Sequence, residues 1–205
     1  QGLIDRNLKF NLWAYARVDT VRKDQLELFK KAGVNWLALG IESGNQSVRV
    51  EIDKGRFKQV NIREVVKDIK ASGINVLGNY IFGFPDDNMD TMNETLDLAL
   101  ELQCEHSNFY SAQALPGSPL YLLAKKNKWD IPEKYEEFAF LSYKCKPLRT
   151  KYLTSKEVLN FRDNAWNKYF SNLNYLNLVE KKFGDEAKKN IINLSKIKLK
   201  RKILE

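Results

Sequence analysis

The sequence is poor in the residues that build metal sites. Its 205 residues contain two cysteines, Cys104 and Cys145, and a single histidine, His106. The two cysteines are too far apart in the chain to form a metal-binding motif, and a disulfide is not expected in a reducing compartment. We therefore predict two ordinary thiols and no metal ligands. A lone histidine is usually packed or solvated, which is the role expected of His106.

Long apolar runs are also missing. No stretch approaches the roughly 20 apolar residues that cross a bilayer, and the first residues, QGLIDRNLKF, lack the organisation of a signal peptide. Apolar residues nevertheless make up 43% of the chain, which suffices for a hydrophobic core. We expect a cytoplasmic protein with one large or two small domains.

The first half of the chain has no net charge. Residues 1–100 contain 14 basic and 14 acidic side chains, whereas residues 101–205 contain 20 and 12 and carry the whole net charge of +8. The last 25 residues, 181–205, are the most basic part. We interpret them as a solvated helical end, with attraction of RNA phosphates or an anionic membrane surface as the alternative. No aromatic residue follows Phe183, which weakens the nucleic-acid interpretation.

Short apolar runs alternate with amphipathic runs in the first half of the chain. The patterns predict strands at residues 10–16, 35–41, 74–82 and 107–113, and helices at residues 23–32, 61–72 and 92–102. Asn61 with Glu64, Thr91 with Glu94 and Thr154 with Glu157 form capping patterns that predict three helix starts. Such alternation indicates parallel strands in a barrel or an open sheet. About four units are too few to close a TIM-type barrel, so the edge at residues 10–16 is expected to stand open.

The second part of the chain is predicted to be helical. Short helices are expected at residues 120–128 and 133–140, and longer ones at residues 154–170, 175–183 and 185–203. We therefore divide the chain into an α/β part at residues 1–121 and a basic helical extension at residues 122–205.

Three glycine-containing segments follow apolar runs: GIESG at residues 40–44, GNYIFGFPDD at 78–87 and ALPGSPLY at 114–121. The carboxyl ends of parallel strands meet at the edge of the sheet where ligands bind, and glycine lets the backbone approach them closely. Glu42 and Ser43 are thus candidates for accepting hydrogen bonds from a ligand. The alternative is that Glu42 only caps the next helix. In ALPGSPLY, Ser118 is predicted to cap a helix that begins at Pro119.

In this order and spacing, the three segments resemble the second half of a radical S-adenosylmethionine (SAM) core, most closely the kind found with a cobalamin-binding domain. The resemblance covers residues 10–121 and extends more weakly through the helical tail. It implies a partial TIM-type (β/α) barrel followed by a C-terminal helical extension. The family's cluster-binding CxxxCxxC motif is absent from these residues.

The resemblance also implies a SAM site. Glu42 and Ser43 match the residues that contact the ribose and methionyl group, and Lys54 matches a basic residue paired to the SAM carboxylate. Ile81 and Gly83 match the motif whose backbone packs on adenine. No catalytic residue and no metal ligand are identified.

Arg17 and Asp19 follow the first strand and match a similar Ala-Arg-x-Asp of the relatives. Both side chains are expected to project toward the barrel mouth. Contact of Arg17 with SAM and a purely structural Arg–Asp pair remain alternatives at this point.

The implied function is that of part of a radical SAM enzyme, which cleaves SAM reductively to modify an unactivated C–H bond. Cobalamin-dependent methyl transfer is one form of that chemistry. The 4Fe–4S cluster is expected on residues outside this chain, which alone is predicted to be inactive. The implied partners are the N-terminal remainder of the same protein with cobalamin in a preceding domain, an unknown substrate, and flavodoxin or ferredoxin as electron donor.

Two alternatives stay open. One is a tRNA-modifying, methylthiotransferase-like radical SAM enzyme that uses the basic tail to hold its substrate. The other is a non-catalytic barrel fragment that binds RNA or a protein partner through residues 181–201. A CxxxCxxC motif upstream of Gln1 favours an enzyme over a binding fragment.

Overall fold

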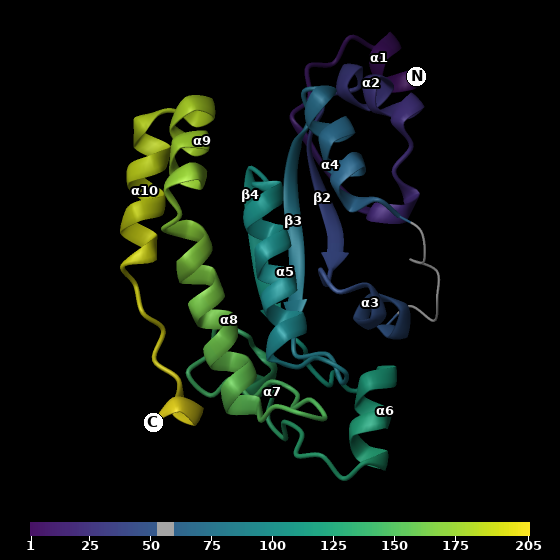
Figure 1. Ribbon diagram of the computed structural model, residues 1–205. Coiled ribbons are helices and arrows are strands. Elements are labelled where there is room, and N and C mark those ends of the chain that lie inside the picture. Colours follow the sequence, from purple (N-terminus) through teal and green to yellow (C-terminus); the bar gives the residue numbers. More distant parts are fainter. Residues whose placement is uncertain (53–59) are drawn as a thin grey trace.

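A computed structural model describes residues 1–52 and 60–205 (Figure 1). Four parallel strands pair in the order β1-β2-β3-β4. Their bounds are β1 (Leu12–Arg17), β2 (Val34–Glu42), β3 (Asn75–Phe82) and β4 (His106–Ser111). Strand order equals chain order, as in consecutive β/α units of a barrel. The predicted α/β fold with a partial barrel is confirmed.

Helices cover one face of this sheet. The helices that pack on it are α2 (Lys23–Lys31), α4 (Ile62–Ala71), α5 (Met89–Leu102) and α8 (Ser155–Phe170), the last of which lies along β4 (Figure 1). Side chains that point toward these helices are fully buried, among them Leu39, Tyr80 and Phe82. On the opposite face of edge strand β1, Trp13 is 55% exposed and Tyr15 is 80% exposed. The hydrophobic core therefore lies between the sheet and its helices, and the inner face of the sheet is open at β1.

The remaining elements are short or helical. They are α1 (Gly2–Asp5), η1 (Val18–Thr20), α3 (Gln46–Ile52), α6 (Pro119–Lys126), α7 (Tyr135–Phe138), α9 (Leu173–Phe183), α10 (Asp185–Ser195) and η2 (Lys202–Leu204). Helices α9 and α10 pack side by side beyond β4 (Figure 1). The C-terminal part is thus helical, as predicted, while the domain boundary at residue 121 stays a prediction. Among the described residues, no helix has the length and apolar composition needed to cross a membrane.

Several predicted helix starts are confirmed by their caps. The Asn61 side chain accepts a hydrogen bond from the Glu64 backbone amide (3.3 Å) at the start of α4. Ser118 caps α6 by accepting from the Tyr121 amide (3.1 Å). A capping box that begins at Thr154 opens α8. In each case, a polar side chain satisfies an amide that the first helical turn leaves unpaired.

The predicted start of α5 is wrong by three residues. The sequence pattern of Thr91 and Glu94 placed the cap at Thr91, whereas the structure places it at Asn88. The Asn88 side chain accepts from the Thr91 amide (3.0 Å), and the Thr91 hydroxyl accepts from the Asn88 amide (3.0 Å). Thr91 is therefore the third helical residue of a capping box, a place that threonine fills as well as the usual glutamate.

The predicted C-terminal helix is also too long. Helix α10 ends at Ser195 and not at residue 203, and the chain continues without regular structure to η2. The reason is Arg201, whose side chain is fully buried in a bidentate ion pair with Asp163. The interpretation of the whole tail as solvated is wrong at this residue. The helix predicted at residues 133–140 shrinks to the single turn of α7.

The turn after β3 packs tightly against α8. Gly83 has φ +87°, and a Cβ at this position would lie 2.4 Å from Val158 Cγ1. Gly117 has a similar φ of +83°, but a Cβ there would meet nothing within 4 Å. The two glycines thus share one backbone conformation and differ in whether a neighbour fills the space of the missing side chain.

We predict that Gly83→Ala destabilises the protein by about 3 kcal/mol or more, because backbone strain adds to an overlap in the core. Gly117→Ala, the matched control, costs about 1 kcal/mol through the backbone alone. Urea unfolding measures both. In a Val158→Ala background the loss caused by Gly83→Ala shrinks, since the methyl group that it meets is gone. Equal losses for the two glycine variants would show that α8 does not press on this turn.

Candidate functional site

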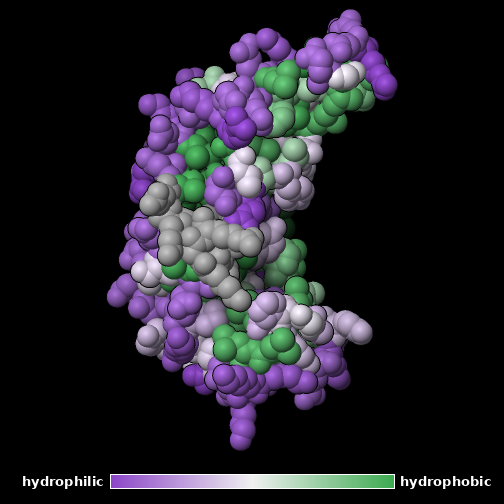
Figure 2. All heavy atoms as spheres, turned by 90° about the vertical axis from the view of Figure 1, so that its right-hand side faces the viewer, coloured by the Kyte–Doolittle hydropathy of each residue, from purple (hydrophilic) through white to green (hydrophobic). Residues whose placement is uncertain are grey.

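A hollow of about 470 Å³ opens on the inner face of the sheet near the carboxyl ends of the strands. All four strands contribute to its lining, which comprises Tyr15, Ala16, Arg17, Gly40, Glu42, Asn79, Ile81 and Tyr110. The space-filling view shows the molecule hollowed on one side, toward the right of Figure 2. A concave site at the carboxyl ends of parallel strands is the usual place for a ligand in α/β folds.

The local backbone of β2 directs Glu42 into this hollow. The pairing of β2 with β3 shifts register between Gly40 and Glu42, and Glu42 takes a left-handed φ of +64°. A Cβ on Gly40 would lie 2.7 Å from the Glu42 Oε1 atom, so the carboxylate folds back over the glycine. A left-handed backbone at a residue other than glycine costs free energy and is enriched at functional sites.

The surroundings of the Glu42 carboxylate compensate its negative charge poorly. Burial raises its pKa, and the positive charge of Arg17 acts in the opposite direction. Within residues 1–52 and 60–205, no group donates a hydrogen bond to it. Asn45 caps α3 by accepting from the Val48 amide (3.0 Å). The alternative that Glu42 merely caps this helix is therefore wrong, and its carboxylate is available to a ligand.

Arg17 forms the predicted pair with Asp19, while its contact with SAM stays a prediction. Its Nε and Nη2 atoms donate to the two Asp19 carboxylate oxygens, at 3.0 and 2.9 Å. The same side chain lines the hollow beside Glu42. A bidentate pair holds the guanidinium in one orientation, which fixes its positive charge at the mouth of the site.

Two predicted site residues, Ser43 and Gly83, are not part of the lining among the described residues. The Ser43 hydroxyl is buried against α5, where it contacts the Thr95 hydroxyl (3.1 Å) and accepts from the Asn45 amide (3.2 Å). A Cβ atom at Gly83 would meet the Val158 side chain, so the close contact of this glycine is with α8 and not with the hollow. Lys54 lies outside the described residues. A role of these three in binding the cofactor stays a prediction.

The sequence reasoning missed Tyr15, Asn79 and Tyr110, which line the hollow with the predicted residues. Side chains two positions apart in a strand point to the same face, so Asn79 accompanies Ile81 and Tyr15 accompanies Arg17. This alternation was the signal that could have found them.

His106 is packed, as the sequence predicted. Its ring lies 5.5 Å from that of Phe170, and burial lowers its pKa. It does not line the hollow.

Asp87 explains the shape of the segment that follows β3. Its buried carboxylate accepts from the amides of Gly83 (3.0 Å) and Phe84 (2.9 Å) and from the Thr91 hydroxyl (2.7 Å). These bonds hold the turn after Ile81 in place. The neighbouring Asp86 forms an ion pair with Lys151 instead.

Comparison with known proteins finds a family that part of this chain resembles. Residues 13–99, which include three of the four strands and most of the hollow, match the sequence profile of the Radical SAM superfamily. Over these residues the chain is similar to a radical SAM domain. The predicted resemblance is confirmed.

Two curated relatives match part of this chain in sequence, and one of the similar solved structures shares its fold. An uncharacterized methyltransferase of Pyrococcus horikoshii is 26% identical over 77% of this chain and 33% of its own length. The tRNA-2-methylthio-N(6)-dimethylallyladenosine synthase of Shewanella sp. is 24% identical over 53% of this chain and 23% of its own length. The chain thus spans about a third or less of these relatives.

The solved structure is that of the radical SAM methyltransferase TsrM from Kitasatospora setae, with cobalamin and a 4Fe–4S cluster bound. It covers 57% of this chain and 23% of TsrM, with a TM-score of 0.51 and 18% identity. At this identity the likeness shows the fold alone.

The residues of the hollow fit SAM and do not fit the 4Fe–4S cluster, the two cofactors of this superfamily. SAM carries hydroxyl and ammonium donors, which suit the Glu42 carboxylate, to which none of the described residues donates a hydrogen bond. A cluster needs thiolates, whereas burial raises the pKa of the Cys104 thiol to about 12. The described residues contain no group of three His, Cys, Asp or Glu side chains that could hold a metal ion. The described residues therefore suit SAM, and the cluster requires ligands elsewhere.

We predict that Glu42→Gln stabilises the protein at pH 7.5, because it removes a carboxylate whose ionised form is disfavoured by burial. A raised pKa means that the folded state binds a proton more readily than the unfolded state, so stability falls as the pH rises through it. The gain in melting temperature should therefore shrink as the pH is lowered toward 4.5.

Glu186→Gln, which changes an exposed carboxylate on α10, is the matched control and should leave the melting temperature unchanged. A Glu42→Gln variant that is less stable than the wild type at pH 7.5 would show that the carboxylate is held by contacts within the protein.

Proposed function

We propose that this chain is the SAM-binding part of a radical SAM enzyme and that the hollow holds the nucleoside and methionyl end of SAM. The observation that carries the proposal is the convergence of Arg17, Glu42 and Ile81 in one hollow of the part that resembles a radical SAM domain. These residues come from three different strands, and the sheet alone brings them together.

Each side chain has a distinct part in this proposal. The Glu42 carboxylate accepts hydrogen bonds from ribose hydroxyls or from the ammonium group, and Arg17 complements the negative charge of the methionyl carboxylate. Ile81 supplies an apolar surface for the adenine ring. Lys54 is proposed as a second cation for the SAM carboxylate, on the resemblance alone.

Ser43 and Gly83 are proposed to act from behind the site. The Ser43 hydroxyl fixes the turn after β2, and Gly83 allows the turn after β3 to pack on α8. Each turn sets the position of a neighbouring residue, Glu42 in the first case and Ile81 in the second.

When bound, SAM and a 4Fe–4S cluster supply the reductive cleavage that lets such enzymes modify an unactivated C–H bond. The residues of this chain bind and orient SAM. We propose that the cluster is held by an N-terminal remainder of the same protein and that flavodoxin or ferredoxin donates the electron. The cytoplasmic location stays a prediction.

Methyl transfer is the form of this chemistry that we favour. The P. horikoshii relative, which matches 77% of this chain, is named a methyltransferase. A cobalamin-binding domain before the chain is part of this proposal, while the substrate is taken up below. The alternative of methylthio transfer is supported by the Shewanella relative over a shorter part of the chain.

We predict that Glu42→Gln weakens SAM binding ten- to a hundredfold in the full-length protein, which contains this chain, with its cluster assembled. Loss of one hydrogen bond to a charged group costs about 1.5–3 kcal/mol, which corresponds to that range. Wild-type affinity should fall as the pH is lowered through the raised pKa of Glu42, and the variant should lack this dependence.

Isothermal titration calorimetry across pH 5–8 measures both effects. Ile81→Ala is expected to weaken binding less, because it trims one apolar contact, and His106→Gln should leave it unchanged. Unchanged affinity in Glu42→Gln together with a loss in His106→Gln would place the SAM site outside the hollow.

A further inference from the structure

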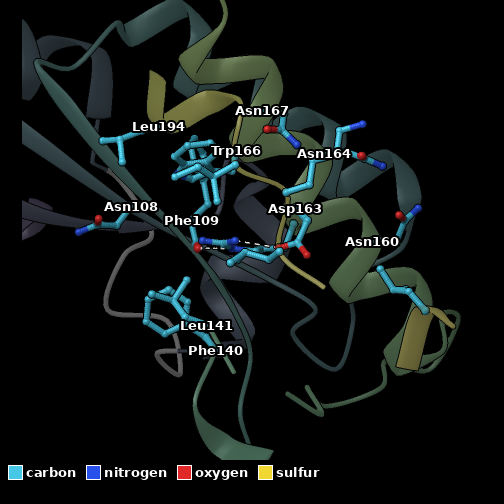
Figure 3. A pocket seen from close by; sticks show the side chains of 15 residues that line it. Asn108, Phe109, Phe140, Leu141, Asn160, Asp163, Asn164, Trp166, Asn167 and Leu194 are labelled. Atoms are coloured by element: carbon cyan, nitrogen blue, oxygen red, sulfur yellow. Dashed lines mark hydrogen bonds and ion pairs between the residues drawn. The ribbon is translucent and has the colours of Figure 1, made fainter. Parts of the chain in front are cut away.

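A second cavity, of about 540 Å³, lies beside β4 between α8, the Phe140–Leu141 segment and the chain after α10 (Figure 3). Its lining combines three aromatic side chains, Phe109, Phe140 and Trp166, with the amide side chains of Asn108, Asn160, Asn164 and Asn167. A cavity with apolar surfaces and a few convergent polar groups is typical of a small-molecule site.

This cavity adjoins the SAM hollow directly. Asn108, which lines the cavity, donates a hydrogen bond to the Oδ1 atom of Asn79, which lines the hollow (3.0 Å). Tyr110 of the hollow makes an edge contact with Phe140 of the cavity, at 5.1 Å between ring centres. A single layer of side chains therefore separates the two spaces.

One wall of the cavity is held in place by a buried ion pair. The Arg201 side chain is fully buried and donates to both Asp163 oxygens, at 2.8 and 2.9 Å. It also donates to the backbone carbonyls of Phe140 and Ser142, each at 2.9 Å. These bonds connect the segment after α10 to α8 and to the segment that contains Phe140. Ile197 and Leu199 of the segment after α10 line the cavity.

Positive charge is in excess around this cavity. Arg162 also donates to Asp163 (2.8 Å), so two guanidinium groups, each at most 5% exposed, share one carboxylate. Lys198 lines the cavity as well, and it has no carboxylate partner among the residues that the structure describes. A buried charge is costly unless an opposite charge compensates it. The arrangement therefore has room for one further anion.

In the view of Figure 3, Trp166 and Phe140 lie on opposite sides of the ion pair that ends on Asp163. The Arg162 guanidinium lies 5.5 Å from the centre of the Phe140 ring. Aromatic surface and excess positive charge thus occur at the same place. Planar rings stack on such surfaces, and a planar carboxylate matches the fork of an arginine.

We propose that this cavity binds the substrate and that the substrate is a flat aromatic molecule with a carboxylate group. Its identification as the substrate site rests on the proposed function, because the cavity borders the hollow assigned to SAM. Trp166 holds the ring, and Lys198 and Arg162 attract the carboxylate.

The test uses three probes of one shape and different charge: 2-naphthoate, 2-naphthylmethanol and 2-naphthylmethylamine. Binding to the full-length protein is measured by isothermal titration calorimetry. We expect the carboxylate to bind at least tenfold more tightly than the alcohol, and the amine to bind most weakly. Trp166→Leu should weaken the carboxylate and the alcohol alike, at least fivefold.

Lys198→Gln changes an exposed side chain and should weaken only the carboxylate, about threefold, as expected for a charge at the rim. Lys196→Gln, in the same segment but outside the lining, is the matched control and should change nothing. Absence of binding, equal binding of the three probes, or equal effects of the two lysine variants would overturn the proposal.

Measurements of SAM affinity distinguish a failure of this proposal from a failure of the proposed function. Trp166→Leu and Lys198→Gln should leave SAM affinity unchanged, and Glu42→Gln should leave 2-naphthoate affinity unchanged. Suppose that the protein binds 2-naphthoate as expected but that Glu42→Gln does not weaken SAM binding. This result would support the substrate cavity and contradict the assignment of the hollow to SAM.

Discussion

The structure depends on a parallel sheet that buries one face under its helices and leaves the other face open. Buried side chains such as Leu39, Tyr80 and Phe82 fix the helices α2, α4, α5 and α8 on the outer face. Because successive side chains of a strand point to opposite faces, the intervening residues must point inward. The inner face thus receives Arg17, Asn79 and Ile81 as a consequence of how the core packs.

A local departure from regular strand geometry turns this open face into a site. The shift in pairing at the end of β2 and the left-handed conformation of Glu42 place a carboxylate over Gly40. Burial raises the pKa of that carboxylate while Arg17 opposes the effect. Burial in the folded protein therefore disfavours the ionised form of this carboxylate.

Much of this arrangement could be predicted from the sequence. Alternating apolar patterns predicted the four strands, and the caps at Asn61, Ser118 and Thr154 predicted the starts of three helices. The GIESG segment predicted Glu42 at a strand end, where the structure places it on the lining of the hollow. These features are local, because they depend on residues within a few positions of one another.

The features that the sequence did not reveal depend on contacts between distant segments. Whether Ser43 faces the hollow is decided by Thr95 of α5, and the demand for glycine at position 83 is set by Val158 of α8. The end of α10 is decided by the pairing of Arg201 with Asp163. Charge composition suggested a solvated tail, since composition does not show which single arginine finds a buried partner.

The most direct test of the account is an experimental structure of the full-length protein with its cluster assembled and SAM bound. The account predicts SAM in the hollow, with the Glu42 carboxylate within hydrogen-bond distance of a SAM hydroxyl or ammonium group and with Ile81 against the adenine. SAM bound elsewhere, with the Glu42 carboxylate still folded over Gly40 and in contact with no ligand, would contradict it.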